Sequence, residues 1–323
     1  MFNVTSPKRV KANMKAFLCA VLILFPFLSA ARVIINVKYI EETTGYSISS
    51  FPAAHFITVT VLAVVVILMS KLFELKYLTK DFDPTKGDYT PTNISPYSEI
   101  IYNKTSAIVV FMSAFLGFAM ITSFFLLIFN LFSGTFTANS IISAILILSL
   151  ALSGMFFIIS ATNQAAPRRK YYTFLSFAPV LWASMRIIMY FMDTTRYMNT
   201  TSHHLTLFSS MAIAVFFLFQ SRFTLSDYKY HKMGTFFASG LVSLLFVSCS
   251  SLPSLVSVAF FPYTLQNSNE NDIIFWLLDV IIAFYIVTRL FCVLSQIDKI
   301  TDEDLKDYAR GYTESISEDK SKK

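Results

Sequence analysis

Charged residues are scarce in this sequence, and so are the residues that interrupt helices. Only 14% of its 323 residues are charged, and the chain contains 8 Gly and 10 Pro. Apolar residues make up 55% of the chain, 34 residues are Phe, and the mean hydropathy is +0.58. This composition excludes a loop-rich, water-soluble domain and is typical of a chain whose solvent is largely lipid.

Cysteine and the common catalytic motifs are also rare or absent. The three cysteines, Cys19, Cys249 and Cys292, are far apart and form no C-x-x-C pair, which argues against a disulfide framework or a metal cluster. No Walker loop, Rossmann glycine pattern, H-E-x-x-H or G-x-S-x-G motif occurs. We therefore expect no metal, no cofactor and no enzymatic activity, and we expect the thiols to pack inside apolar spans.

A helix needs about 20 apolar residues to cross a hydrocarbon core about 30 Å thick. Eight such runs occur, near residues 16–36, 51–70, 106–132, 139–161, 172–192, 205–221, 235–261 and 273–296. Because peptide groups find no water in lipid, each run is predicted to be a helix. The expected fold is all-α: a polytopic transmembrane bundle of about eight spans over residues 1–296, with a cytoplasmic loop at 71–105 and a charged cytoplasmic tail at 297–323.

The basic residues predict the orientation of this bundle. In an eight-span chain, 22 of the 26 Lys and Arg lie on one side or at its boundary, and the other four are Arg32, Lys38, Arg186 and Arg196. Positive flanks stay inside, so both termini are expected in the cytoplasm of a cell-membrane protein. The net charge of +6 is then explained by anionic lipid headgroups rather than by nucleic acid.

The first span also resembles a signal peptide, with small residues Ser29, Ala30 and Ala31 at a cleavage point. Cleavage there would leave seven spans. The apolar pattern continues to Ile35 and reaches full spanning length, which favours an uncleaved helix. A seven-span rhodopsin is excluded because no Lys lies between Lys232 and Lys299 to form a retinal Schiff base. The Asp-Arg-Tyr and Asn-Pro-x-x-Tyr motifs of G-protein-coupled receptors are absent as well.

The two halves of the chain share a weak pattern. Pro26, Arg32 and Glu42 follow one another in and after the first span, as Pro179, Arg186 and Asp193 do in and after the fifth. This pattern predicts a parallel four-plus-four internal repeat. The alternative is that membrane helices share composition by necessity.

Ionisable residues inside the hydrocarbon are costly and mark candidate sites. Arg186 and Asp279 lie about six residues from the same membrane face, so a rise of about 1.5 Å per residue predicts that they pair. Trp182 and Tyr190 share a helix face with Arg186, where either ring can stack on the guanidinium. Two interpretations stay open. Arg186, together with Arg32, holds an anionic group at the floor of an outward-facing cavity, or Arg186 and Asp279 form a structural pair that sets helix register.

The histidines give only weak evidence for a metal site. His203 and His204, with Asp193 and Arg196 nearby, are expected on the outer loop before the sixth span. Adjacent His without further ligands at zinc-like spacing favour a solvated interfacial loop over a metal site. His55 is expected to be an interfacial or packing residue.

The stretch Ala178-Pro179-Val180-Leu181-Trp182-Ala183-Ser184-Met185-Arg186, followed by Asp193-Thr194-Thr195, resembles uncharacterised multi-pass membrane proteins of low-GC Gram-positive bacteria. The resemblance carries no assigned activity, and it implies the bacterial cytoplasmic membrane.

Three classes of function remain. A small-solute transporter or permease is favoured by the repeat and the buried charges, with Pro253 and Pro26 the best candidates for breaking a helix. A non-enzymatic sensor or assembly partner, which would act through another membrane protein, is the alternative because the soluble parts are short. A membrane-embedded enzyme would need a richer polar constellation than the sequence offers.

Overall fold

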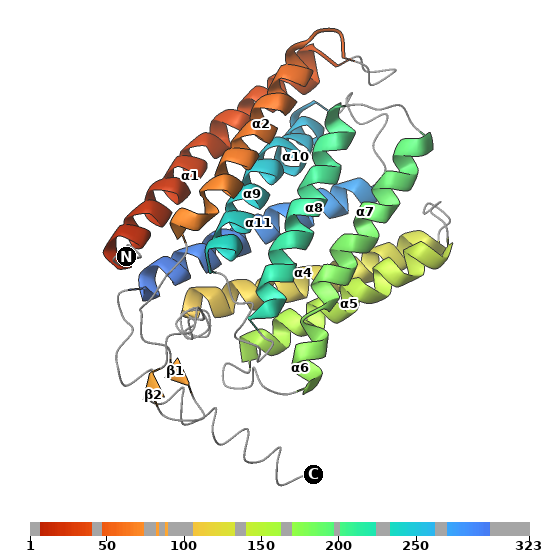
Figure 1. The fold of residues 1–323 in the computed structure, drawn as a ribbon. Helices are drawn as coiled ribbons and strands as arrows, with labels where there is room; N and C mark the ends of the chain where they lie inside the picture. Colours follow the sequence, from red (N-terminus) through yellow and green to blue (C-terminus); the bar gives the residue numbers. More distant parts are fainter. Residues whose placement is uncertain are drawn as a thin grey trace.

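The computed structural model describes residues 7–40, 47–73, 82–83, 88–89, 106–132, 140–162, 170–196, 201–223, 233–261 and 270–297. It confirms the all-α polytopic bundle (Figure 1). The helices are α1 (Pro7–Lys38), α2 (Phe51–Leu68), η1 (Met69–Phe73), α4 (Ala107–Phe132), α5 (Ser140–Thr162), α6 (Lys170–Leu175), α7 (Ala178–Arg196), α8 (Thr201–Arg222), α9 (Met233–Cys249), α10 (Ser251–Phe260) and α11 (Glu270–Gln296). The short strands β1 (Phe82–Asp83) and β2 (Asp88–Tyr89) pair antiparallel within the expected 71–105 loop.

Among the described residues, seven helical segments are long and apolar enough to cross a membrane. They match seven of the eight predicted spans, with α2 continuing into η1 and α9 into α10. The predicted third and fourth spans end within one residue of α4 and α5. The first span is longer than expected, since α1 begins at Pro7 and not near residue 16.

The predicted fifth span, 172–192, is not one continuous helix. It is divided into α6 and α7 by a turn at Ser176 and Phe177. Pro179 explains the break, because it has no N–H to bond the carbonyl of Leu175, where α6 ends. The apolar part of α7, Ala178–Met192, is therefore shorter than the other spans.

Even so, α7 keeps the up-and-down order of the bundle. Tyr172 of α6 packs on Phe156 near the end of α5, with ring centroids 5.3 Å apart. Tyr190, near the other end of α7, packs on Phe275 near the start of α11 at 6.4 Å. The segment thus connects the two ends of the bundle, as the sequence predicted for its fifth span.

Helix α9 forms the centre of the molecule. All its residues except Thr235 are buried, and it packs against α1, α2, α8 and α11. It carries no charged residue, and a helix that is apolar all round is stable only inside a bundle. In Figure 1, α1 and α2 lie along one edge and the α4–α5 hairpin along the other, with α9 between them.

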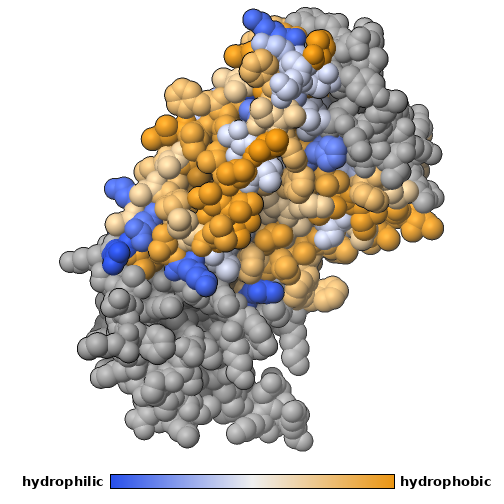
Figure 2. Space-filling model, turned by 45° about the horizontal axis from the view of Figure 1, so that its top comes forward, coloured by the Kyte–Doolittle hydropathy of each residue, from blue (hydrophilic) through white to orange (hydrophobic). Residues whose placement is uncertain are grey.

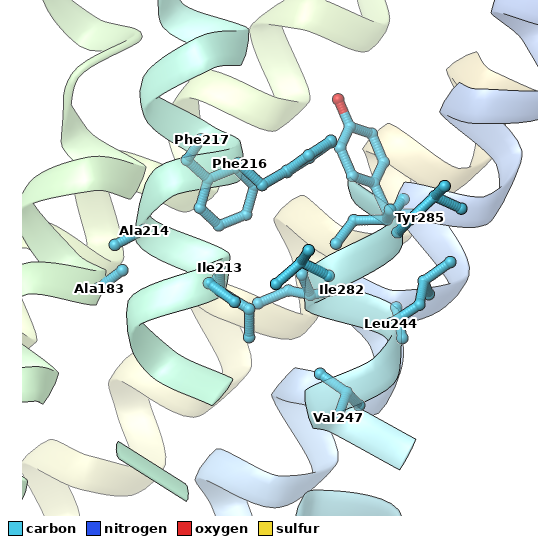
Figure 3. Packing of buried hydrophobic residues seen from close by; sticks show 14 of the residues in the cluster. Ala183, Ile213, Ala214, Phe216, Phe217, Leu244, Val247, Ile282 and Tyr285 are labelled. Carbon is cyan, nitrogen blue, oxygen red and sulfur yellow. The ribbon is translucent and has the colours of Figure 1, made fainter. Parts of the chain in front are cut away.

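Small and bulky side chains alternate in the core around α8. Figure 3 shows Ala183 of α7 beside Ala214 of α8, where two small residues let the helices approach closely. Phe157 of α5 packs on Phe217 of α8 and on Tyr285 of α11, with centroids 5.7 and 5.2 Å apart. These contacts join helices from both halves of the chain into one core.

The hairpin of α4 and α5 has the closest backbone approach. A Cβ on Gly117 would lie 2.9 Å from the carbonyl oxygen of Gly154, and a Cβ on Gly154 would lie 3.0 Å from that of Gly117. Both positions therefore require glycine, as at other close helix crossings in membranes.

Many of the 34 phenylalanines face outward, as expected of a chain whose solvent is largely lipid. Phe111, Phe118, Phe125 and Phe129 of α4 are all more than 60% exposed on the bundle surface. Figure 2 shows apolar side chains covering the middle of the visible face, with hydrophilic residues toward its ends. This distribution suits a surface in contact with lipid.

The halves of the chain do not pack alike. α8 packs extensively along α9, whereas α2 and α4, which would correspond to them in a four-plus-four repeat, share no comparable interface among the described residues. The repeat therefore stays a prediction from sequence.

α1 packs on both sides of the candidate cleavage point at Ser29–Ala31. Met14 and Leu18 are fully buried before it, and Arg32 is 1% exposed after it. In this structure the first span packs into the bundle interior, and its retention stays a prediction from sequence.

Candidate functional site

Four charged side chains are buried among the residues that the structure describes. Three are cations, Arg32, Arg186 and Arg289, and one is an anion, Asp279. A buried charge is costly unless it is paired, so the partners of each of these groups indicate its role.

Arg186 and Asp279 form the predicted pair. Nη1 of Arg186 donates to Oδ1 of Asp279, and Nη2 donates to Oδ2 at 2.7 Å, in a bidentate arrangement. Oδ2 also accepts a hydrogen bond of 2.5 Å from the hydroxyl of Ser251 at the start of α10. The carboxylate is therefore fully engaged, and the pair joins α7, α10 and α11.

Aromatic rings enclose the guanidinium of Arg186. Its central carbon lies 5.6 Å from the ring centroid of Trp182 and 5.2 Å from that of Tyr190, as the shared helix face predicted. Phe275 completes the enclosure at 5.0 Å. Phe275 was not among the predicted site residues, although it lies four residues before Asp279 and thus on the same face of α11.

Arg32 does not join this pair. Its Nη2 donates to the hydroxyl of Ser202 on α8 at 2.6 Å, and its Nη1 has no hydrogen-bond partner among the described residues. Cys249 and His55 are near enough to interact with it electrostatically. Within the described part of the chain, no carboxylate pairs with this guanidinium, which is 1% exposed.

The break between α9 and α10 lies between the two arginines. Pro253, a predicted helix breaker, has no N–H for the carbonyl of Cys249, the last residue of α9. Before the break, the carbonyl of Ser248 accepts a 2.7 Å hydrogen bond from Ser29, three residues before Arg32 on α1. After the break, Ser251 bonds Asp279. Pro26, the other predicted breaker, lies inside a continuous α1.

The prediction that His203 and His204 lie on a loop is wrong. Both residues lie in the first turn of α8, which begins at Thr201. The helix extends past the apolar run because its first side chains find partners in the bundle. Nε2 of His203 lies 3.1 Å from the carbonyl oxygen of Tyr190, and the ring of His204 lies 6.2 Å from that of Phe56. The two imidazoles thus have different neighbours.

Asp193 and Arg196, which were expected near the His203–His204 loop, lie in the last turn of α7, and His55 and the cysteines lie in other helices. His55 is half-buried, with Nε2 3.4 Å from the carbonyl oxygen of Leu28. Cys249 and Cys292 are buried as expected, whereas Cys19 is exposed on the surface of α1. The side chains of Asp193 and Arg196 lie outside the described residues.

Arg289 belongs to a second polar layer that the sequence analysis missed. The count of basic residues placed Arg289 on the cytoplasmic side or at its boundary, but its side chain is 4% exposed inside the bundle. Its Nε donates to the hydroxyl of Tyr285 at 3.1 Å, and Nε2 of Gln220 donates to the same oxygen at 2.7 Å. Ten residues separate Arg289 from Asp279, so this layer lies about 15 Å further along α11.

Comparison with protein-family models, curated proteins and solved structures finds no match to this chain. Its chemistry must be inferred from its own residues.

The two arginines beside the broken helix differ in what they can do. Arg186 has a carboxylate counter-ion, and its Nε and the neighbouring indole N–H of Trp182 have no hydrogen-bond partners among the described residues. Arg32 donates to the neutral hydroxyl of Ser202, and its Nη1 has no hydrogen-bond partner among the described residues. The pair therefore has the character of a structural bridge, and Arg32 has that of an open cationic site.

Proposed function

We propose that this protein is a permease-like carrier that moves a small anionic solute across the cell membrane. The observation that carries the proposal is a buried excess of positive charge beside a broken transmembrane helix. Arg32 and Arg186 flank the α9–α10 break, and the one buried carboxylate among the described residues, Asp279, pairs with Arg186 and not with Arg32. Carriers commonly bind solutes where a membrane helix is discontinuous.

A carrier needs a segment that can move as well as a charged site, and the break between α9 and α10 provides one. α10 is only 10 residues long, and it packs on α1 and α11, which hold Arg32 and Asp279. Backbone bonds continue through Ser250, but Pro253 removes one hydrogen bond between α9 and α10, so the short α10 can shift against its neighbours more easily than the end of an uninterrupted helix.

Flux measurements test the proposal. Purified protein in liposomes should exchange internal for external anions faster than protein-free liposomes, in counterflow with a panel of labelled inorganic anions and short carboxylates. The topology predicted from basic flanks places Arg32 and Arg186 in the outer half of the membrane. If folded protein gives no flux above protein-free liposomes for any anion, the carrier proposal is wrong.

A further inference from the structure

We propose that Arg32 is the anchor of a binding site for a small, water-soluble monovalent anion. This inference deepens the proposed carrier function by naming the class of solute and the residue that holds it. It depends on three features of the described residues: the missing counter-ion, the polar groups around Arg32, and its position in the interior.

The missing counter-ion is the first feature. An ionised guanidinium buried in the bundle requires a negative partner, and among the described residues Arg32 has only the hydroxyl of Ser202. Arg186, a comparable buried arginine, has a bidentate carboxylate. A bound anion would supply to Arg32 what Asp279 supplies to Arg186.

The second feature is a polar stripe on one face of α1. Ser29, Arg32 and Asn36 follow one another at helical spacing, and this stripe continues the buried apolar positions Leu18 and Val21. Ser29 is engaged with the carbonyl of Ser248, but Nη1 of Arg32 and Oδ1 of Asn36 are buried without partners among the described residues. The unpaired N–H of Arg32 is a donor that an anion can satisfy, whereas Oδ1 of Asn36 is an acceptor that an anion would not satisfy, so the Arg32 donor is the group that indicates an anion.

The third feature, the interior position of Arg32, bears on the source of the ligand. Arg32 contacts Ser202 of α8 and lies near Cys249 of α9, so it faces the bundle interior and not the lipid. A lipid phosphate would have to carry its glycerol and acyl chains between these helices. A small water-soluble anion fits the setting better, and one negative charge is enough to balance one guanidinium.

Thermal unfolding in detergent tests the site. Chloride, formate or acetate at about ten times the dissociation constant should raise the unfolding temperature of the wild-type protein by about 2–4 °C over gluconate at equal ionic strength. Arg32→Gln should abolish this shift. Arg289→Gln, a change in another buried arginine far from the site, should keep it. Equal shifts in wild type and Arg32→Gln would overturn the proposal.

Ser202→Asp offers a second test that does not depend on removing Arg32. The hydroxyl of Ser202 already touches the guanidinium, so a carboxylate at this position would act as a built-in counter-ion. We expect Ser202→Asp to unfold at or above the wild-type temperature and to lose the anion-dependent shift. Ser202→Ala should keep the shift but require about five to ten times more anion. If Ser202→Asp keeps the wild-type shift, Arg32 is not the anchor.

The source of the anion is tested with lipid. Nanodiscs with zwitterionic lipid alone should show the full chloride or acetate effect. If stabilisation appears only with anionic phospholipid and is insensitive to soluble anions, the occupant is a headgroup and the proposal for a soluble anion is wrong. Anion binding without flux would support the Arg32 site and overturn the carrier function. Anion flux that persists in Arg32→Gln would support the carrier function and overturn the Arg32 site.

Discussion

At the scale of single residues, the bridge between Arg186 and Asp279 accounts for how three helices are held together. Its carboxylate accepts hydrogen bonds from Arg186 and Ser251, and its guanidinium lies among three aromatic rings. Removing one member of such a pair leaves the other charge buried and unpaired, which costs more than the pair itself contributes.

Asp279→Asn should therefore destabilise the protein by about 3–5 kcal/mol, because Arg186 would lose its counter-ion. Ser251→Ala should cost only about 1 kcal/mol, the value of one hydrogen bond. Fluorescence-detected thermal unfolding in detergent measures both. The control is Ser254→Ala, whose hydroxyl bonds only the local carbonyl of Ser250. If Asp279→Asn stays fully folded and loses only anion flux, the pair is a ligand site and not a structural bridge.

A second residue-scale prediction concerns Tyr285, whose hydroxyl accepts hydrogen bonds from Gln220 and Arg289. Tyr285→Phe leaves both donors without this oxygen and should destabilise the bundle by about 1–3 kcal/mol. Tyr39→Phe is the matched control, since Tyr39 is only half-buried and makes a ring contact with Phe51. Equal unfolding temperatures for the two variants would contradict a buried polar layer at Tyr285.

At the scale of helices, glycine decides how α4 and α5 approach. Gly117→Ala should destabilise the hairpin by about 1–3 kcal/mol, because the new methyl group would meet the backbone of Gly154 and the packing cannot relax around a carbonyl. Gly240→Ala is the matched control. There the nearest atoms, at 3.1 to 3.2 Å, belong to the movable side chains of Leu290 and Ile286. A Gly240→Ala variant less stable than Gly117→Ala would contradict this account.

At the scale of the whole molecule, the orientation in the membrane is open to direct measurement. Single cysteines at Lys80, Lys320 and Asn199, in a chain without Cys19, Cys249 and Cys292, report the side on which each lies. Because basic flanks stay inside, a membrane-impermeant maleimide should label position 199 in intact cells and positions 80 and 320 only after permeabilisation. Labelling of 80 or 320 in intact cells would invert or disprove the predicted threading.

Much of the architecture was predictable from sequence for a physical reason. The free energy of moving a helix into lipid is roughly a sum over its residues, so the runs near 106–132 and 139–161 located α4 and α5 almost to the residue. The regular rise of a helix also sets the depth of each side chain. That was enough to predict that Arg186 meets Asp279 and that Trp182 and Tyr190 flank it.

Only the tertiary structure could decide which faces of these helices meet. Depth along a helix does not determine its neighbours, so the sequence could not show that Arg32 lies against Ser202 without a carboxylate, or that Arg289 points inward to Tyr285. Nor could it show that Gly117 and Gly154 would coincide at one crossing. Such contacts depend on the rotation and packing of each helix among all the others, which local hydropathy does not record.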